Sequence, residues 1–227
     1  MTASPEARGQ RPEAVEPEFA VLGASAVRHA AVPTLAFDLH VAEPSGRQVY
    51  TVALTVQVMI EPARRRYDDA AREKLVELFG PPERWAVTTR NMVWAHLDAL
   101  VPGFTGSTTF RVPIVCSYDH EVAAAKYFHS LGDGEVPLAF NFNGTVYYRD
   151  DDGGLQMSLV PWSCSAEYRM PVSVWRDLIE HYYPQAGWLA LHIDTLDALA
   201  REKARRGLPT LDACVSQLLA ENEGREP

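Results

Sequence analysis

A long stretch of alternating residues constrains the fold of this chain more than any other feature. Between residues 49 and 60 every second side chain is apolar; the apolar set is Val52, Leu54, Val56, Val58 and Ile60. A period of two with a more polar opposite face predicts a strand of an antiparallel sheet with one buried face. Residues 34–41 form a second β-branched run, and a turn signal lies between the two at residues 43–46. The two runs are predicted to pair as a long hairpin.

Further strands are predicted downstream by the same alternation. Residues 108–116 place Phe110, Val112, Ile114 and Cys116 on one face, and Pro113 within them indicates an edge strand or a bulge. Residues 137–148 and 155–160 are predicted to form a partnered pair. Within the first of these, Asn143-Gly144 favours either a tight primed turn or a bulge in one longer strand.

Helices are predicted where apolar residues recur at helical spacing. Residues 68–79 form one such stripe, with Asp68 as its cap. Three more follow Pro171: one over residues 172–182, one ending near Gly207, and one beginning at Thr210. Two segments stay open between helix and strand: residues 85–101, where a strand is favoured, and residues 119–131, where a helix is favoured.

The order of these elements predicts the fold class. Strands come first and helices last, which is typical of α+β proteins and unlike the strand–helix alternation of parallel folds. We expect an antiparallel sheet built mainly from residues 19–160 and covered by the C-terminal helices. The domain organisation expected is a disordered tail over residues 1–17, a single α+β domain over residues 18–221, and a flexible C-terminus over residues 222–227.

Charge and cysteine usage narrow the classes of function. The chain has 30 acidic and 21 basic residues and a formal net charge of −9, which disfavours binding to nucleic acid. Three cysteines without a Cys-x-x-Cys pair favour a reducing cytoplasm. No run of about 18 uncharged apolar residues occurs, so we expect no membrane span.

Motifs for catalysis or cofactor binding are missing from the sequence. It has no P-loop, no dinucleotide-binding glycine pattern, no G-x-S-x-G and no H-E-x-x-H. The candidates for a metal site or a reactive thiol are Cys116, His120 and His129, if the intervening chain folds back on itself. Because Cys116 lies on the apolar phase of its strand, a core cysteine is the favoured interpretation. We therefore expect no catalytic residue, no metal and no cofactor.

Aromatic residues exceed what the predicted helical stripes require. The aromatic residues that do not belong to a predicted helical stripe could form an apolar patch that a protein partner covers. The candidates for such a partner surface are Trp85, Trp94, Trp162 and Trp188.

A set of short strings spread over residues 19–220 is shared with a known family. They include Phe19-Ala20-Val21-Leu22-Gly23, Arg65-Arg66-Tyr67, Phe104-Thr105-Gly106-Ser107-Thr108, Lys126-Tyr127-Phe128, Gly134-Glu135-Val136-Pro137-Leu138 and Met170-Pro171. With them the chain resembles an actinobacterial domain-of-unknown-function family that is often encoded near NiFe-hydrogenase genes. The resemblance brings no catalytic residues. It implies a role beside a hydrogenase.

The leading hypothesis is a non-catalytic accessory or binding protein that assists the assembly, maturation or stability of a NiFe-hydrogenase. Its partner would be a hydrogenase subunit or precursor. One alternative is a metal-binding maturation factor or enzyme that uses Cys116, His120 and His129. The other is a chaperone-like protein that binds apolar segments.

Overall fold

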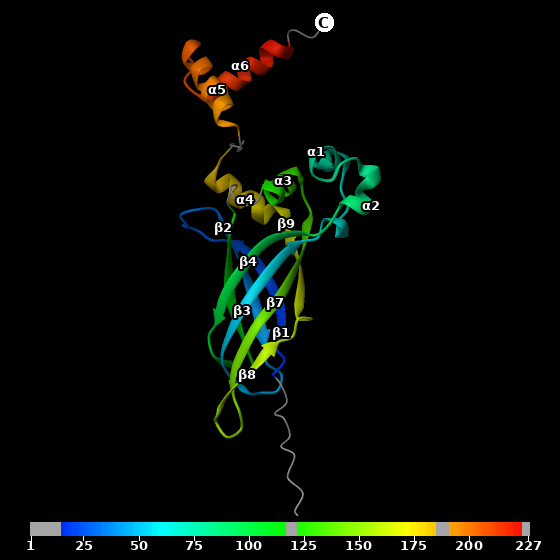
Figure 1. Ribbon diagram of the computed structural model, residues 1–227, viewed down its shortest axis with the longest axis vertical. Helices are drawn as coiled ribbons and strands as arrows, with labels where there is room; N and C mark the ends of the chain where they lie inside the picture. The colour runs from blue at the N-terminus through cyan, green and yellow to red at the C-terminus, as the bar shows by residue number, and fades with distance from the viewer. Residues whose placement is uncertain (1–14, 117–121, 185–190, 224–227) are drawn as a thin grey trace, which may run out of the picture. The chain divides into compact units, whose positions relative to one another are not determined.

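The alternating run of the sequence forms β3 (Gln48–Ile60), a central strand of the larger sheet (Figure 1). Its predicted inward residues are all buried, so the predicted strand and its buried face are confirmed. The computed structural model describes residues 15–116, 122–184 and 191–223. The chain divides into two compact units, residues 1–185 and 186–227.

Two antiparallel sheets form the first unit. In the smaller sheet the strand order is β1 (Glu18–Ala26), β2 (Thr34–Ala42), β6 (Ser107–Val115). In the larger sheet it is β4 (Met92–Val101), β3, β7 (Glu135–Arg149), β8 (Leu155–Val160), while β5 (Phe104–Thr105) pairs with β3 and β9 (Ser165–Pro171) pairs with β7. With the helices described below, the α+β class is confirmed.

The hairpin expected between residues 34–41 and 49–60 is wrong. Both runs are strands, but β2 pairs with β1 and β6, whereas β3 pairs with β4 and β7. The link between them turns at Glu43, whose buried carboxylate accepts hydrogen bonds from the backbone N–H groups of Ser45 (3.0 Å) and Arg47 (2.8 Å). Because both strands have an apolar face, placing them in stacked sheets buries both faces at once.

Aromatic contacts between the sheets show that they stack as a sandwich. Phe37 of β2 lies with its ring centroid 5.2 Å from that of Phe140 in β7 and 5.9 Å from that of Trp94 in β4. Phe19 of β1 stacks on Phe142 of β7 at 4.2 Å. The core is thus formed between two sheets, where the sequence predicted one sheet under helices.

Gly144 lies within one long strand, so of the two alternatives at Asn143-Gly144 the primed turn is wrong and the longer strand is correct. The pairing of β7 with β3 runs without a shift from Leu138 to Tyr147, which also excludes a bulge at this position. A Cβ atom on Gly144 would lie 2.0 Å from the carbonyl oxygen of Ala53. Glycine is therefore required here by the close approach of the neighbouring strand.

The segment after β3 and two later segments form the helices of the first unit. They are α1 (Asp69–Phe79), α2 (Trp85–Thr88), α3 (Val122–Ser130) and α4 (Val172–Tyr182), with 3-10 turns η1 (Pro62–Arg64) and η2 (Pro82–Arg84). Figure 1 shows them gathered at one end of the sandwich. The predicted cap of α1 is confirmed, because Asp68 accepts a hydrogen bond from the Ala71 N–H at 2.7 Å.

The two ambiguous segments are resolved by the structure. Residues 85–101 contain both α2 and, from Met92, strand β4. Residues 122–130 are helical as favoured, while 119–121 lie outside the described residues. Helix α3 is held against α4 by Phe128, whose ring stacks on Trp175 at 5.3 Å.

Residues 15–17 belong to the folded sandwich. Val15 is buried, and its carbonyl oxygen accepts a hydrogen bond from the Ser158 hydroxyl at 3.0 Å. Most of the tail expected over residues 1–17 lies outside the described residues, as do residues 224–227 of the expected flexible C-terminus. Ordered packing nevertheless begins before Glu18.

The second unit consists of α5 (Ile193–Arg205) and α6 (Leu211–Glu223). The Thr210 hydroxyl caps α6 by accepting a hydrogen bond from the Ala213 N–H at 3.1 Å. No helix in the described part of the chain is long and apolar enough to cross a membrane.

Candidate functional site

The cysteine and histidines singled out in the sequence do not form a site in the described residues. Cys116 is buried, and its thiol donates to the Ile114 carbonyl oxygen at 3.6 Å. His129 is exposed near the end of α3, and His120 lies outside the described residues. Nowhere in residues 15–116, 122–184 and 191–223 do three or more His, Cys, Asp or Glu side chains gather as metal ligands would.

The four candidate tryptophans have different environments. Trp94 is buried against Phe37 and, at 5.0 Å, against Phe128, so it is removed from the candidate surface and assigned to the core. Trp85 is half-buried and donates its indole N–H to the Gly80 carbonyl oxygen at 2.8 Å. Trp188 lies outside the described residues. Trp162 is 93% exposed.

Trp162 lies two residues after strand β8, which exposes several large apolar side chains. Three side chains of β8 point away from the core, and all three are apolar: Leu155 is 58% exposed, Met157 68% and Leu159 72%. The name apolar β8 face is used below for Leu155, Met157, Leu159 and Trp162. An exposed apolar group of this kind marks an interaction surface more often than an isolated exposed leucine does.

The pairing register explains why β8 turns its apolar side outward. Val146 and Tyr148 of β7 are buried, and they lie opposite Ser158 and Gln156. Since neighbouring residues across a sheet point to the same side, Gln156, Ser158 and the buried Val160 lie on the inner side of β8. Leu155, Met157 and Leu159 lie on the outer side. A shift by one residue would bury the apolar set, so the register itself creates the surface.

The outer surface continues across the larger sheet. Leu159 lies opposite Thr145, Thr145 opposite Ala53, and Ala53 opposite Leu100, which is also strongly exposed. In the adjacent row Met157 lies opposite the half-buried Tyr147. No formal charge occurs in either of these rows. The outer side of the sheet is therefore uncharged beside Met157 and Leu159, whereas Leu155 lies opposite the exposed Arg149.

One edge of strand β8 has no strand paired with it among the described residues. The strand pairs with β7 on one side, and no described strand pairs with it on the other. The turn that leads into it is held by Asp150, which accepts hydrogen bonds from the Gln156 side-chain amide (3.0 Å) and the Gly154 N–H (2.6 Å). These hydrogen bonds, the Gln156 one foremost, lower the pKa of the Asp150 carboxyl. The start of the edge strand is thus fixed in place.

A second feature lies among the helices of the first unit. The Tyr67 hydroxyl lies 2.9 Å from the Tyr127 hydroxyl and 2.8 Å from the Pro62 carbonyl oxygen, to which it donates. Burial raises the pKa of both phenols, so both are protonated at neutral pH. Beside them is an open hollow of about 520 Å³ whose lining includes Arg65, Arg66 and Arg72.

Comparisons with known proteins bear on the family and not on a site. The model of a family of unknown function, DUF6084, matches residues 14–227. The chain belongs to this family. No curated protein matches it. Among solved structures, a crystal structure described as "the Putative ApaA Protein from Bordetella pertussis" is 9% identical over 70% of this chain and 94% of that chain, with a TM-score of 0.25. A TM-score this low supports no conclusion about fold or function.

Sequence reasoning found Trp162 and the strand beside it, but not the side on which that strand exposes its apolar residues. Residues 155–160 are predicted as a strand, without a prediction of which side faces the core. The alternation of Leu155, Met157 and Leu159 with Gln156 and Ser158 shows that the strand has two different sides. It does not show which of the two is buried. Only the pairing with β7 decides between the two.

Proposed function

We propose that this protein is a non-catalytic binding protein that docks a partner protein on the apolar β8 face. The observation that carries the proposal is the exposure of Leu155, Met157, Leu159 and Trp162 on one edge strand and the turn after it. Large apolar and aromatic side chains are the usual anchors of protein interfaces. An edge strand with such a face is an aggregation hazard when it stays uncovered.

The geometry favours an extended segment of the partner as the occupant. A strand added beside β8 would complete the free backbone edge with main-chain hydrogen bonds. Its alternate side chains would then lie next to those of Leu155, Met157 and Leu159. Because the rows of the sheet beside Met157 and Leu159 carry no charge, the matching segment is expected to be apolar and uncharged where it meets these two side chains.

The identity of the partner is proposed from the resemblance stated for the sequence. It points to a subunit or precursor of a NiFe-hydrogenase, and a role in its assembly, maturation or stability. A subunit that has not finished folding exposes extended apolar segments, which is the chemistry that the apolar β8 face would recognise. We propose a cytoplasmic location because three cysteines without a Cys-x-x-Cys pair favour a reducing compartment.

The test is direct binding to purified hydrogenase subunits of the host, in mature and precursor form. Calorimetry should detect a complex with the intact protein. The Met157→Lys variant should bind at least about tenfold more weakly, since a buried anchor residue contributes about 2 kcal/mol or more. Val87→Lys is the matched control, because Val87 of α2 is about as exposed as Met157 and lies outside the apolar β8 face. Both variants should keep their stability within about 0.5 kcal/mol.

Other outcomes separate the rival explanations. Suppression of the aggregation of unrelated unfolding proteins, lost in Met157→Lys, would point to a general chaperone. Concentration-dependent dimerisation lost in the same variant would assign the face to a second copy of the chain. Equal binding by both lysine variants would refute the docking role of the apolar β8 face.

A further inference from the structure

The hollow beside Tyr67 has an unusual lining for a protein with a net charge of −9. It is formed by η1, the segment after it, α1 and α2, and its principal side chains are Arg65, Arg66, Tyr67, Arg72 and Trp85. No aspartate or glutamate is among the described residues that line it. Its volume of about 520 Å³ is within the usual range for small-ligand sites.

The charge of Arg65 is not balanced by an acidic partner among the described residues. Its guanidinium donates to two backbone carbonyl oxygens, that of Glu135 at 3.0 Å and that of Asp133 at 2.6 Å. Its Nε atom is buried and has no hydrogen-bond partner in the described residues. Carbonyl groups satisfy hydrogen bonds but leave the positive charge in place. The nearby phenols of Tyr67 and Tyr127 stay protonated, so they supply no negative charge either.

The two other arginines are available to a ligand. Arg66 is exposed and makes no side-chain hydrogen bond or ion pair with any described residue. Arg72 pairs with Asp69 at 3.3 Å, but both side chains are largely exposed, and an exposed pair of this kind is weak. Three guanidinium groups with little compensation produce a local positive potential that attracts an anion.

Aromatic rings form another wall of the hollow. The Trp85 ring meets Tyr67 edge to face at 5.4 Å between centroids, and its indole N–H is bonded to Gly80. Arg65 lies over the Tyr67 ring at 5.5 Å. These contacts fix the rings in position. A flat apolar group beside a positive rim is therefore the complementary shape.

We propose that this hollow binds a small organic anion, whose phosphate or carboxylate group pairs with Arg66 and Arg72 while its planar part lies against Trp85. The site lies outside the apolar β8 face and does not depend on the function proposed for that face. It would allow a metabolite to bind the same protein that docks a partner.

The experiment is a calorimetric titration of the full chain with phenyl phosphate, benzoate and benzyl alcohol. The three probes share a ring and differ in the group it bears. The phosphate and carboxylate arms show which anion is preferred, and benzyl alcohol reports binding by the ring alone. We expect one of the two anions to bind in a one-to-one ratio. Its affinity should fall as the salt concentration rises from about 0.05 to about 0.5 M, because salt screens charges beyond about 10 Å at 0.1 M.

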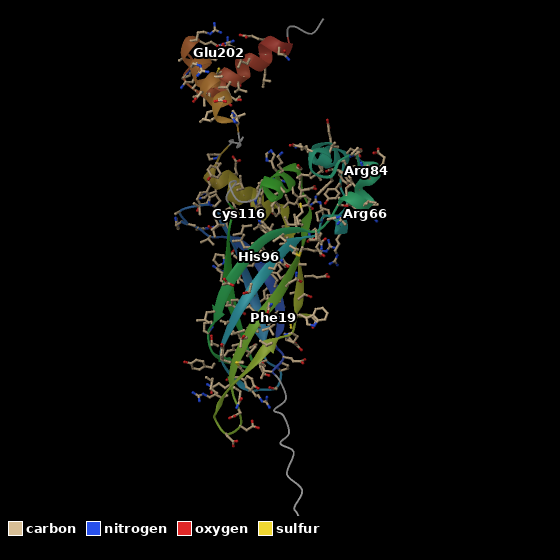
Figure 2. All side chains as sticks on the ribbon, in the orientation of Figure 1. Phe19, Arg66, Arg84, His96, Cys116 and Glu202 are labelled. Atoms are coloured by element: carbon tan, nitrogen blue, oxygen red, sulfur yellow. The ribbon has the colours of Figure 1, made fainter. Side chains whose placement is uncertain are left out.

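Matched variants locate the binding. Arg66→Gln should weaken it about fivefold, which corresponds to an exposed charge pair of about 1 kcal/mol. Arg84→Gln is the control, because Arg84 is an exposed arginine next to Trp85 that does not line the hollow and has no side-chain partner among the described residues; Figure 2 labels both arginines. The proposal is overturned if neither anion binds, if benzyl alcohol binds as tightly, or if the two variants behave alike.

Discussion

The sandwich unit and the helical unit of this chain are held together by different forces. In the sandwich, both sheets and helices α1, α3 and α4 contribute to one continuous apolar core. In the helical unit, Cys214 is the one buried side chain among the described residues, and Ile193 and Leu219 are mostly exposed. A core of that size stabilises little, because burial of apolar surface is the main favourable contribution to folding.

Ion pairs supply much of what links the two helices of the second unit. Glu202 of α5 accepts hydrogen bonds from Arg205 at 2.5 and 2.8 Å and also pairs with Arg206. Arg206 in turn reaches Glu221 of α6 at 2.5 and 3.1 Å, in a two-pronged contact. Such contacts are sensitive to salt and pH, whereas an apolar core is not. We therefore expect core substitutions to destabilise the sandwich unit, and changes of salt or pH to destabilise the helical unit.

The largest effect on stability is expected when an aromatic ring is removed from the core of the sandwich unit, because only that unit should then lose stability. Phe37→Ala should lower the free energy of unfolding of the sandwich by about 3–5 kcal/mol, because it leaves a cavity between the two sheets. Urea unfolding followed by tryptophan fluorescence measures this, with the exposed Val87→Ala as the control. Hydrogen exchange in residues 193–223 should not change. A parallel loss of protection there would show instead one cooperative domain, as predicted for residues 18–221.

A smaller effect tests the polar contact inside the sandwich unit. Tyr127→Phe should cost about 1 kcal/mol, the usual net value of one hydrogen bond, since Tyr67 keeps its bond to Pro62. The pKa of both phenols is raised by burial, so their contribution to stability is present below the ordinary tyrosine pKa of about 10 and is lost as pH rises above it. The variant should therefore lose less stability between pH 9 and pH 11, a range set by that value of about 10. An unchanged alkaline loss, against Tyr50→Phe as control, would contradict this.

The smallest effect is expected in the helical unit. Hydrogen bonds from Arg205 and Arg206 lower the pKa of Glu202 to about 2. Because the folded pKa is depressed, the contribution is present above the ordinary value of 4.5 and is lost as pH falls from there toward about 2. Hydrogen exchange of residues 193–205 should therefore speed up over that range, and with added salt at pH 7. Glu202→Gln should weaken both responses while leaving exchange in β3 and β7 unchanged, and the contact of Arg206 with Glu221 should account for the response that remains.

Sequence reasoning predicted the elements of this fold better than their partners. Strand β3, the capped helix α1 and strand β8 follow from local patterns, because alternation and capping depend on neighbouring residues. The sheet to which β2 belongs does not, since pairing joins residues far apart, such as Leu35 with Ile114. The choice between a turn and a longer strand at Gly144 stayed open for the same reason: the glycine is required by Ala53 on another strand.

The candidate site shows the same division. Composition and motifs alone singled out Trp162 as a surface candidate, and the structure places it in full exposure. They also singled out Trp94, which the packing of Phe37 and Phe128 places in the core. The burial of a tryptophan depends on the residues that pack over it. These come from distant segments, so the local sequence around the tryptophan does not reveal them.

By itself the sequence determined that the chain forms amphipathic strands followed by amphipathic helices, because side-chain periodicity is a local property. The tertiary structure decided that the strands divide into two stacked sheets, that β8 turns Leu155, Met157 and Leu159 outward, and that three arginines line one hollow. Each of these depends on register and on contacts between distant segments. Burial is shared between partners, so a pattern on one strand states only that a face is apolar, and the partner strand decides where that face points.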